Sequence, residues 1–389
     1  MKIFLKKNEE RRIKSGHQWI FSNEILKTEG DTENGDICDL YSNDENYIGK
    51  GFYNKNSLIS FRLLTKNKND EINKAFFSER LKEANSRRYI LGRNVYRMVN
   101  SESDFLPGLI IDRFDKAYSI QIFSFGMNRF LDILIEILIE DFNAEYITEK
   151  DDNEMRILEG LDKINKILYR KNEDITDEFI VNIDEIKYSV NLLEGQKTGF
   201  YLDQIENRKL IRQFIKKNDN VLDLFCNEGG FALNAGYSGA SSVIAVDSSE
   251  YSLDVAKKNS ILNKFNNINF IRNDVFDYLE KEKDQIFDFI ILDPPSFAKS
   301  KKYVKAAVNG YIKLNAKAMR LLKPESFLFT FSCSHHISEE IFRDIICKSA
   351  EKSERKVQIL YFSNSSVDHP VIPGFDETMY LKSCLLRII

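Results

Sequence analysis

The stretch VLDLFCNEGGFALNAG, residues 221–236, joins a short apolar run to a glycine turn and a helical segment. VLDLF has the length and apolar character of a strand that is buried on both faces of a parallel sheet. Gly229 and Gly230 permit a tight turn and a close approach of the backbone to a ligand. Because the helix that starts there presents its first amide donors, the stretch predicts a nucleotide-type ligand at the end of this strand.

Apolar runs of this kind alternate with helical segments through the rest of the chain. They begin at residues 221, 242, 268, 287, 326, 357 and 380. This alternation predicts an α/β fold, a doubly wound Rossmann-like domain whose ligand lies at the carboxyl ends of the strands.

Polar residues follow the second and third of these runs. Asp247 ends SVIAVD and suits a carboxylate that accepts hydrogen bonds from ribose hydroxyls. Asn273-Asp274-Val275 ends the third run and could hold an adenine amino group. Acids at strand ends are common in turns. The glycine turn and these two acidic strand ends nevertheless follow three successive runs, and together they indicate a cofactor crevice.

The fourth and fifth runs end in residues that could carry out chemistry. DPPSFAKSKK, residues 293–302, must stop its strand, because proline has no amide donor and restricts the residue before it. FTFSCSHHI, residues 329–337, brings Cys333 to the same edge. Cys333 is either a buried small side chain or a nucleophile whose pKa a nearby cation lowers. Adjacent histidines diverge on a strand, so no metal is expected.

The chain of 389 residues predicts two or three domains. Residues 1–70 read as short strands separated by turn signals and predict a small β domain. Residues 71–192 mix helical and strand patterns and predict an α+β middle domain. Residues 193–389 form the predicted Rossmann-like domain.

Composition narrows the class of protein. The net charge of −4 and pI near 5.8 argue against non-specific nucleic-acid binding. Local basic clusters, such as the one at residues 2–14, are either contact sites for a specific partner or solvated faces. The N-terminus turns polar too soon for a signal peptide, and five cysteines without a CxxC spacing fit reduced thiols, so a cytoplasmic location is expected. The run FLDILIEILIEDF, residues 130–142, carries acids at four-residue intervals and predicts a surface helix rather than a membrane span.

Several longer motifs resemble one known family, the bacterial ribosomal RNA large subunit methyltransferase I family of S-adenosylmethionine-dependent cytosine C5 methyltransferases. They are GHQWIFS at 16–22, LPGLIIDRF at 106–114, EGQKTGFYLDQIENR at 194–208, and DHPVIPGF at 368–375 followed by YLK. The resemblance covers nearly the whole chain. It implies a PUA-like RNA-binding domain at residues 1–70 and a class I methyltransferase domain at the C-terminal end.

The resemblance also implies roles for individual residues. S-adenosyl-L-methionine would contact Gln204, Arg208, Asp223, Phe225, Asn227, Glu228, Gly229, Gly230, Asp247, Ser248, Ser249, Asp274 and Val275. Cys333 would add to cytosine C6 so that C5 can take the methyl group, with Asp293 on the edge of the base. Pro294 and Phe297 would flank the base, and Lys299, Lys301 and Lys302 would meet phosphates of the large-subunit ribosomal RNA. A homodimer is possible.

Three alternatives stay open. The DPP-aromatic arrangement also resembles methyltransferases that act on exocyclic amines or on guanine N7, in which Cys333 would have no role. A non-catalytic RNA-binding protein would carry a degenerate cofactor pocket, and a nicotinamide dehydrogenase is disfavoured by the missing GxGxxG. DPPSF also lacks the second cysteine found beside the Pro-Pro motif of other RNA cytosine methyltransferases, so either Asp293 or a water must help to remove the C5 proton.

Overall fold

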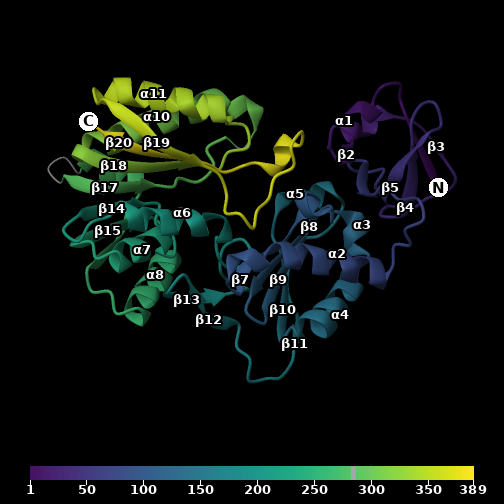
Figure 1. Ribbon diagram of the computed structural model, residues 1–389, viewed down its shortest axis with the longest axis horizontal. Helices are drawn as coiled ribbons and strands as arrows, with labels where there is room; N and C mark the ends of the chain where they lie inside the picture. Colours follow the sequence, from purple (N-terminus) through teal and green to yellow (C-terminus); the bar gives the residue numbers. More distant parts are fainter. Residues whose placement is uncertain (282–285, 299) are drawn as a thin grey trace. The chain divides into compact units, whose positions relative to one another are not determined.

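The computed structural model describes residues 1–281, 286–298 and 300–389, and the chain divides into two compact units (Figure 1). The first unit comprises Met1–Val181, Val190–Leu202 and Val367–Thr378, and the second comprises Asn182–Ser189, Asp203–Ser366 and Met379–Ile389. The domain boundaries at residues 70 and 192 stay predictions.

The first unit begins with a six-stranded sheet in the order β2-β6-β5-β4-β1-β3. Its strands are β1 Lys2–Leu5, β2 Trp19–Ile20, β3 Ile25–Glu29, β4 Ile37–Tyr41, β5 Tyr47–Tyr53 and β6 Phe61–Thr65, with helix α1 at Glu10–Lys14. Within the segment GHQWIFSNEI, residues 16–25, only β2 and Ile25 at the start of β3 pair with other strands. The chain then turns through a 3-10 helix, η1 Ser22–Glu24, because the Glu24 carboxylate accepts a hydrogen bond from Phe21 N at 2.7 Å and closes the turn.

A second sheet of five strands follows, in the order β11-β10-β9-β8-β7. Its strands are β7 Val95–Asn100, β8 Leu109–Phe114, β9 Ala117–Ile122, β10 Tyr146–Asp151 and β11 Ile164–Arg170, and its helices are α2 Lys74–Arg87, α3 Phe125–Asn128, α4 Leu131–Phe142 and α5 Glu154–Leu158. Helix α4 is the predicted surface helix: Leu134 and Leu138 are buried, while Glu136 and Glu140 are exposed. A hairpin of β12 Glu178–Ile183 and β13 Ile186–Asn191 comes next.

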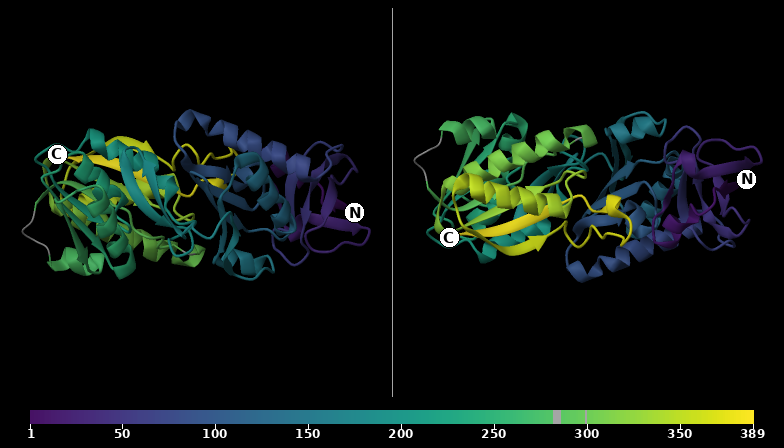
Figure 2. Two further views of the ribbon diagram at one scale, coloured as in Figure 1. Left: turned by 90° about the horizontal axis from the view of Figure 1, so that it is seen from below. Right: turned by 90° about the horizontal axis from the view of Figure 1, so that it is seen from above.

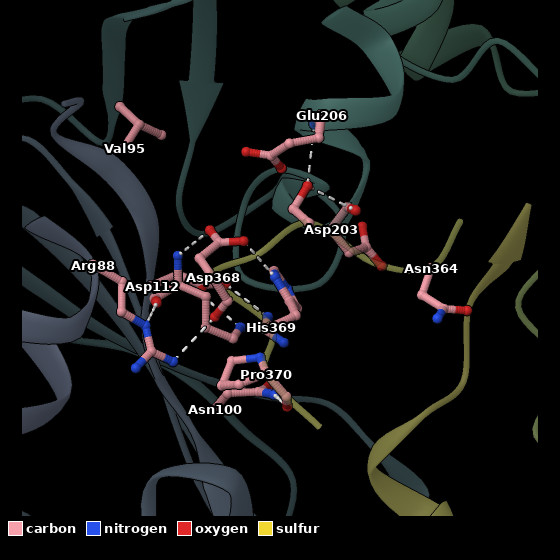
Figure 3. A network of polar contacts seen from close by, with 12 residues as sticks. Arg88, Val95, Asn100, Asp112, Asp203, Glu206, Asn364, Asp368, His369 and Pro370 are labelled. Atoms are coloured by element: carbon pink, nitrogen blue, oxygen red, sulfur yellow. Dashed lines mark hydrogen bonds and ion pairs between the residues drawn. The ribbon is translucent and has the colours of Figure 1, made fainter. Parts of the chain in front are cut away.

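The segment Val367–Thr378 belongs to the first unit although it lies near the C-terminus. The Asp368 carboxylate accepts a hydrogen bond from Arg97 N at 2.8 Å, and the Asp368 carbonyl accepts one from the Arg88 guanidinium at 3.1 Å (Figure 3). The His369 ring lies 2.8 Å from the same carboxylate. The motif DHPV is thus part of a buried polar network.

The second unit is built on a seven-stranded sheet in the order β16-β15-β14-β17-β18-β20-β19. Its strands are β14 Asn220–Leu224, β15 Ser242–Asp247, β16 Ile268–Arg272, β17 Phe287–Leu292, β18 Leu322–Ser332, β19 Val357–Ser363 and β20 Lys382–Ile388. The first five are parallel, and β20 runs antiparallel between β18 and β19. The order reverses at β14, the first strand, so its carboxyl end is the switch point where ligands bind in such sheets.

Helices cover both faces of this sheet (Figures 1 and 2). They are α6 Ile205–Leu210, α7 Gly230–Tyr237, α8 Glu250–Leu262, α9 Val275–Lys281, α10 Val304–Arg320 and α11 Glu339–Ser353. One apolar core packs residues of α9, α10 and α11 against the sheet, and the other packs residues of α7 and α8. The predicted doubly wound α/β architecture is confirmed. Within the part of the chain that the structure describes, no helix has the length and apolar character needed to cross a membrane.

Candidate active site

The turn after β14 holds three residues in left-handed backbone conformations. Phe225 has φ +64°, Asn227 has φ +47° and Gly229 has φ +79°, and α7 starts at the next residue. Left-handed backbone is strained for side chains with a Cβ, and such strain clusters at functional sites. A Cβ at Gly230 would overlap Arg208 Nε, so a larger residue there would have to displace the Arg208 guanidinium.

Asp223, the last but one residue of β14, is completely buried below this turn. One carboxylate oxygen accepts a hydrogen bond from Ala232 N at 2.9 Å, and the other has no hydrogen-bond partner among the described residues. Burial and, to a smaller extent, the charges of Asp293 and Asp247 raise the pKa of Asp223 to about 8, against the opposing effects of the Ala232 amide and Arg208. An unpartnered acceptor in an acidic surrounding fits a cationic or hydrogen-bond-donating ligand.

Asn227 adds a second acceptor of the same kind in this turn. Its side-chain oxygen is also buried without a partner among the described residues. Glu228, the next residue, is buried as well. Asp223 and Asn227 therefore each present a buried side-chain oxygen that has no hydrogen-bond partner among the described residues.

The ends of the second and third strands carry carboxylates that organise backbone amides. Asp247 accepts hydrogen bonds from Asn227 N and Ser249 N, both at 2.9 Å, and it is half-buried, so lone pairs remain for further donors. Asp274 is exposed and accepts from the amides of Phe276 at 2.8 Å and residue 277 at 3.1 Å, which caps α9.

The other residues predicted around these two strand ends differ in exposure. Ser248 is exposed, whereas Val275 is buried at the start of α9. Ser249 has a structural role in addition to any ligand contact, because its hydroxyl accepts from Ser252 N at 3.2 Å and caps α8.

Gln204 and Arg208 lie before β14 and meet different parts of the site. The Gln204 amide donates to a carboxylate oxygen of Asp293 at 2.9 Å, and its own oxygen accepts from Asn207 at 2.7 Å. Arg208 lies beside Gly230 and over the Phe231 ring, 5.9 Å from its centroid. Both residues are predicted cofactor contacts, and the Gln204 amide also ties the segment before β14 to the Asp-Pro-Pro turn.

The Asp-Pro-Pro turn and Cys333 lie next to each other at the ends of β17 and β18. The Cys333 sulfur is 3.8 Å from the Pro294 carbonyl oxygen, and Cys333 is partly exposed. Asp293 is half-buried, and its amide donates to Leu224 O at 3.3 Å, which ties the turn to the end of β14. The two predicted catalytic side chains are therefore brought to one edge of the sheet.

The remaining predicted base-contact and phosphate-contact residues follow this turn. The Phe297 ring packs on Tyr311 of α10 with centroids 4.6 Å apart, so packing accounts for part of its surface. Lys301 and Lys302 are exposed in the 3-10 helix η6 Lys301–Tyr303. Lys299 lies outside the described residues.

Lys382, at the start of β20, is a buried polar residue that the sequence reasoning did not select. It is only 2% exposed, and its ammonium donates to the Ser334 and Tyr380 carbonyls at 2.8 and 2.7 Å. A lysine that opens the apolar run KSCLLRII was the signal that could have found it. Over the described ranges, no group of three or more His, Cys, Asp or Glu side chains is arranged to hold a metal.

Family models match both ends of the chain. One for a PUA-like domain matches residues 3–66, and one for a methyltransferase domain matches residues 215–369. The first match coincides with the six-stranded sheet, and the second contains the strand ends described above.

Solved structures share the fold over the full length. A chain described as a SAM-dependent methyltransferase from Streptococcus mutans aligns with a TM-score of 0.83 at 21% identity, covering 100% of both chains. A methyltransferase solved in complex with SAH aligns with a TM-score of 0.85 at 22% identity and the same coverage.

Curated relatives match at higher identity. The protein named ribosomal RNA large subunit methyltransferase I from Aliivibrio fischeri is 35% identical over 395 residues, covering 100% of this chain and 99% of the relative. The protein of the same name from Tolumonas auensis is 36% identical over 396 residues with the same coverage. The chain belongs to the ribosomal RNA large subunit methyltransferase I family.

Proposed function

We propose that this protein transfers the methyl group of S-adenosyl-L-methionine to C5 of a cytosine in large-subunit ribosomal RNA, with Cys333 as the covalent nucleophile. The observation that carries the proposal is the meeting of Cys333 with the Asp-Pro-Pro turn, whose facing atoms are 3.8 Å apart. A thiol beside an acid at the carboxyl edge of a doubly wound sheet suits covalent chemistry on a base held there.

The acidic turn after β14 supports S-adenosylmethionine as the cofactor. This cofactor supplies an electrophilic methyl group on a sulfonium and carries an ammonium and ribose hydroxyls as further donors. The unpartnered oxygen of Asp223 fits the ammonium, and Asp247 fits the ribose hydroxyls. A cationic ligand would also relieve the repulsion among Asp223, Asp247 and Asp293 that raises the pKa of Asp223.

The chain's own residues then account for the steps at the base. Cys333 adds to C6, which gives C5 the electron density to take the methyl group, and the thiolate leaves when the C5 proton is removed. Asp293, held by the Gln204 amide, accepts a hydrogen bond from the exocyclic amine of cytosine and so orients the ring. The PUA-like domain and the exposed Lys301 and Lys302 supply phosphate contacts.

The proposal is tested by replacing the nucleophile. Cys333→Ala should reduce labelled-methyl transfer to large-subunit ribosomal RNA to background, while the matched control Cys347→Ala, which removes an exposed thiol of α11, should keep full activity. RNA that carries 5-fluorocytidine at the target should become covalently attached to the wild-type protein and not to Cys333→Ala, since fluorine cannot leave as a proton.

The nitrogen-methylation alternative makes the opposite prediction. Full transfer activity in Cys333→Ala, with the methyl group mapped by mass spectrometry to an amine or to a ring nitrogen, would establish that alternative and contradict the C5 mechanism. Calorimetric titration of the cofactor separates both from a non-catalytic RNA-binding protein, which would give no heat of binding.

A further inference from the structure

The buried side chain of Lys382 carries an inference about how Cys333 becomes reactive. Lys382 is the cross-strand partner of Ser332, so it lies at the end of β18 where Cys333 follows directly. A buried lysine loses the hydration of its charge, and such residues are normally paired with a carboxylate. Among the residues that the structure describes, none of the contacts of Lys382 is with a carboxylate.

The contacts of Lys382 account for two of its three N–H donors. They go to the carbonyl oxygens of Ser334 and Tyr380, which fix the ammonium beside the loop that holds Cys333. The titratable group that acts on Lys382 is Cys333 itself: burial lowers the pKa of Lys382 to about 8, and the charge of Cys333 opposes that effect. Lys382 and Cys333 therefore act on each other electrostatically, and the ammonium is fixed at the carbonyl of the residue that follows Cys333.

Among the described residues, the groups that face Cys333 from other elements include a phenol and an acid, neither of which is a cation. Tyr311 of α10 donates to or accepts from the Ser334 hydroxyl at 3.1 Å, and burial raises its pKa, with Cys333 adding to the rise. Asp293 at the end of β17 would repel a thiolate. His335, the next candidate cation, is exposed to solvent.

Tyr380, whose carbonyl accepts a hydrogen bond from Lys382, has two further polar neighbours. The ring of His335 lies 5.7 Å from that of Tyr380, and the Tyr380 hydroxyl donates to Asp203 at 2.6 Å. Asp293, at the turn that Cys333 contacts, disfavours a negative charge on sulfur. Lys382 is thus the buried cation that can compensate a thiolate at Cys333.

We propose that Lys382 is the positioning residue that holds Cys333 as a thiolate. The S–H bond of Cys333 breaks, its proton forms an N–H bond on the Lys382 amine, and the pair becomes thiolate and ammonium without a change in total charge. The two carbonyl contacts keep the ammonium in place while the thiolate adds to carbon and after it leaves. The inference rests on the proposed function, because that function is what requires a thiolate at Cys333. The experiment that tests the inference does not depend on the proposed function.

The test is the pH dependence of cysteine alkylation, which needs neither cofactor nor RNA. The full-length protein is treated with iodoacetamide from pH 5 to pH 10, and the alkylation of each cysteine peptide is followed by mass spectrometry. Cys347, which is exposed, serves as the internal reference. We expect Cys333 to react with a midpoint about one pH unit or more below that of Cys347, and Lys382→Met to abolish this difference.

Two further variants make the assignment specific. Lys382→Arg keeps a cation and should retain the low midpoint, whereas His335→Gln should leave it unchanged. A low midpoint that persists in Lys382→Met, or that disappears in His335→Gln, would overturn the proposal. If Lys382→Met does not fold, the wild-type protein provides the test. An alkylation midpoint of Cys333 at or above that of Cys347 would rule the ion pair out.

The outcome is independent of whether the proposed function is right. A low Cys333 midpoint that depends on Lys382, together with full methyl transfer by Cys333→Ala, would keep the ion pair and remove the C5 mechanism. Loss of transfer in Cys333→Ala with an ordinary Cys333 midpoint would keep the C5 mechanism and remove the role of Lys382.

Discussion

Two buried carboxylates, Asp104 in the first unit and Asp223 in the second, have opposite surroundings. In the first unit, Asp104 receives both ends of the Arg88 guanidinium at 2.6 Å and Asn100 N at 2.7 Å, so each of its oxygens is matched. In the second unit, one oxygen of the fully buried Asp223 has no partner among the described residues. Fully matched carboxylates stabilise a fold, whereas an unmatched one marks a place that a ligand completes.

The pKa directions show the same difference. Burial opposes ionisation of Asp368 in the first unit, but His369, which lies beside it in Figure 3, lowers its pKa together with the Arg97 amide and Arg93. Burial and two neighbouring acids raise the pKa of Asp223 to about 8. The charge of Asp368 is therefore compensated within the chain, whereas that of Asp223 is not compensated by the described residues.

Removing a matched carboxylate should have the largest effect on stability. Asp104→Asn leaves the buried Arg88 guanidinium without its counter-charge, so we expect the free energy of unfolding to fall by about 3–5 kcal/mol. Urea denaturation followed by circular dichroism measures it. A loss below about 1 kcal/mol would mean that this network is no more important than a surface ion pair.

Removing the unmatched carboxylate should act in the opposite direction. Asp223→Asn takes away a charge that the protein does not compensate, so the ligand-free protein should gain about 1–3 kcal/mol of stability. The same variant should bind S-adenosylmethionine at least about tenfold more weakly, a cost of about 1.4 kcal/mol. Thermal denaturation and calorimetry measure the two effects, and a destabilised variant with normal affinity would show that Asp223 is structural.

The gain from Asp223→Asn should depend on pH. The pKa of Asp223 is raised in the folded protein. Well below pH 4 the residue is protonated in both the folded and the unfolded chain, so its ionisation does not lower the free energy of unfolding. As the pH rises toward about 8, only the unfolded chain gains from ionisation, and the wild type loses stability relative to the variant. The stability difference should therefore grow from pH 5 to pH 8, and a constant difference would contradict the raised pKa.

Cofactor binding should release a fraction of a proton from the wild type near pH 7. A bound cation favours the ionised carboxylate, so Asp223 loses the proton that its raised pKa retains. The binding enthalpy should then differ between phosphate and Tris buffers at equal pH. Asp223→Asn should remove that difference, and a buffer-dependent enthalpy that survives in the variant would assign the proton to another group.

A surface ion pair provides the smallest expected effect. Lys348 and Asp344 lie one helical turn apart on α11, 2.6 Å from each other and both exposed. Lys348→Gln should change the free energy of unfolding by less than about 0.5 kcal/mol, because solvent screens this pair. A larger loss would mean that burial does not distinguish the strong carboxylate pairs of the first unit from exposed pairs such as this one.

The strand ends and their order could be predicted from the sequence, because buried parallel strands read as continuous apolar runs. The residues Asp223, Asp247 and Asp293 were found in this way, and the structure gives each a place at the carboxyl end of its strand or directly after it. The contact between Gln204 and Asp293 could not be predicted, because it joins residues 89 positions apart. Lys382 was not selected although it opens an apolar run, because its place beside Cys333 depends on the pairing of β20 with β18.

The sequence by itself determined the α/β architecture, the glycine turn after β14 and the family, because local periodicity and short motifs encode these features. The tertiary structure decided which charges are compensated. It brought the tail segment around Asp368 back to the first unit, left the Asp223 carboxylate half unmatched and placed a buried lysine beside Cys333. Whether a buried charge is satisfied depends on residues far apart in the chain, and only folding brings those residues together.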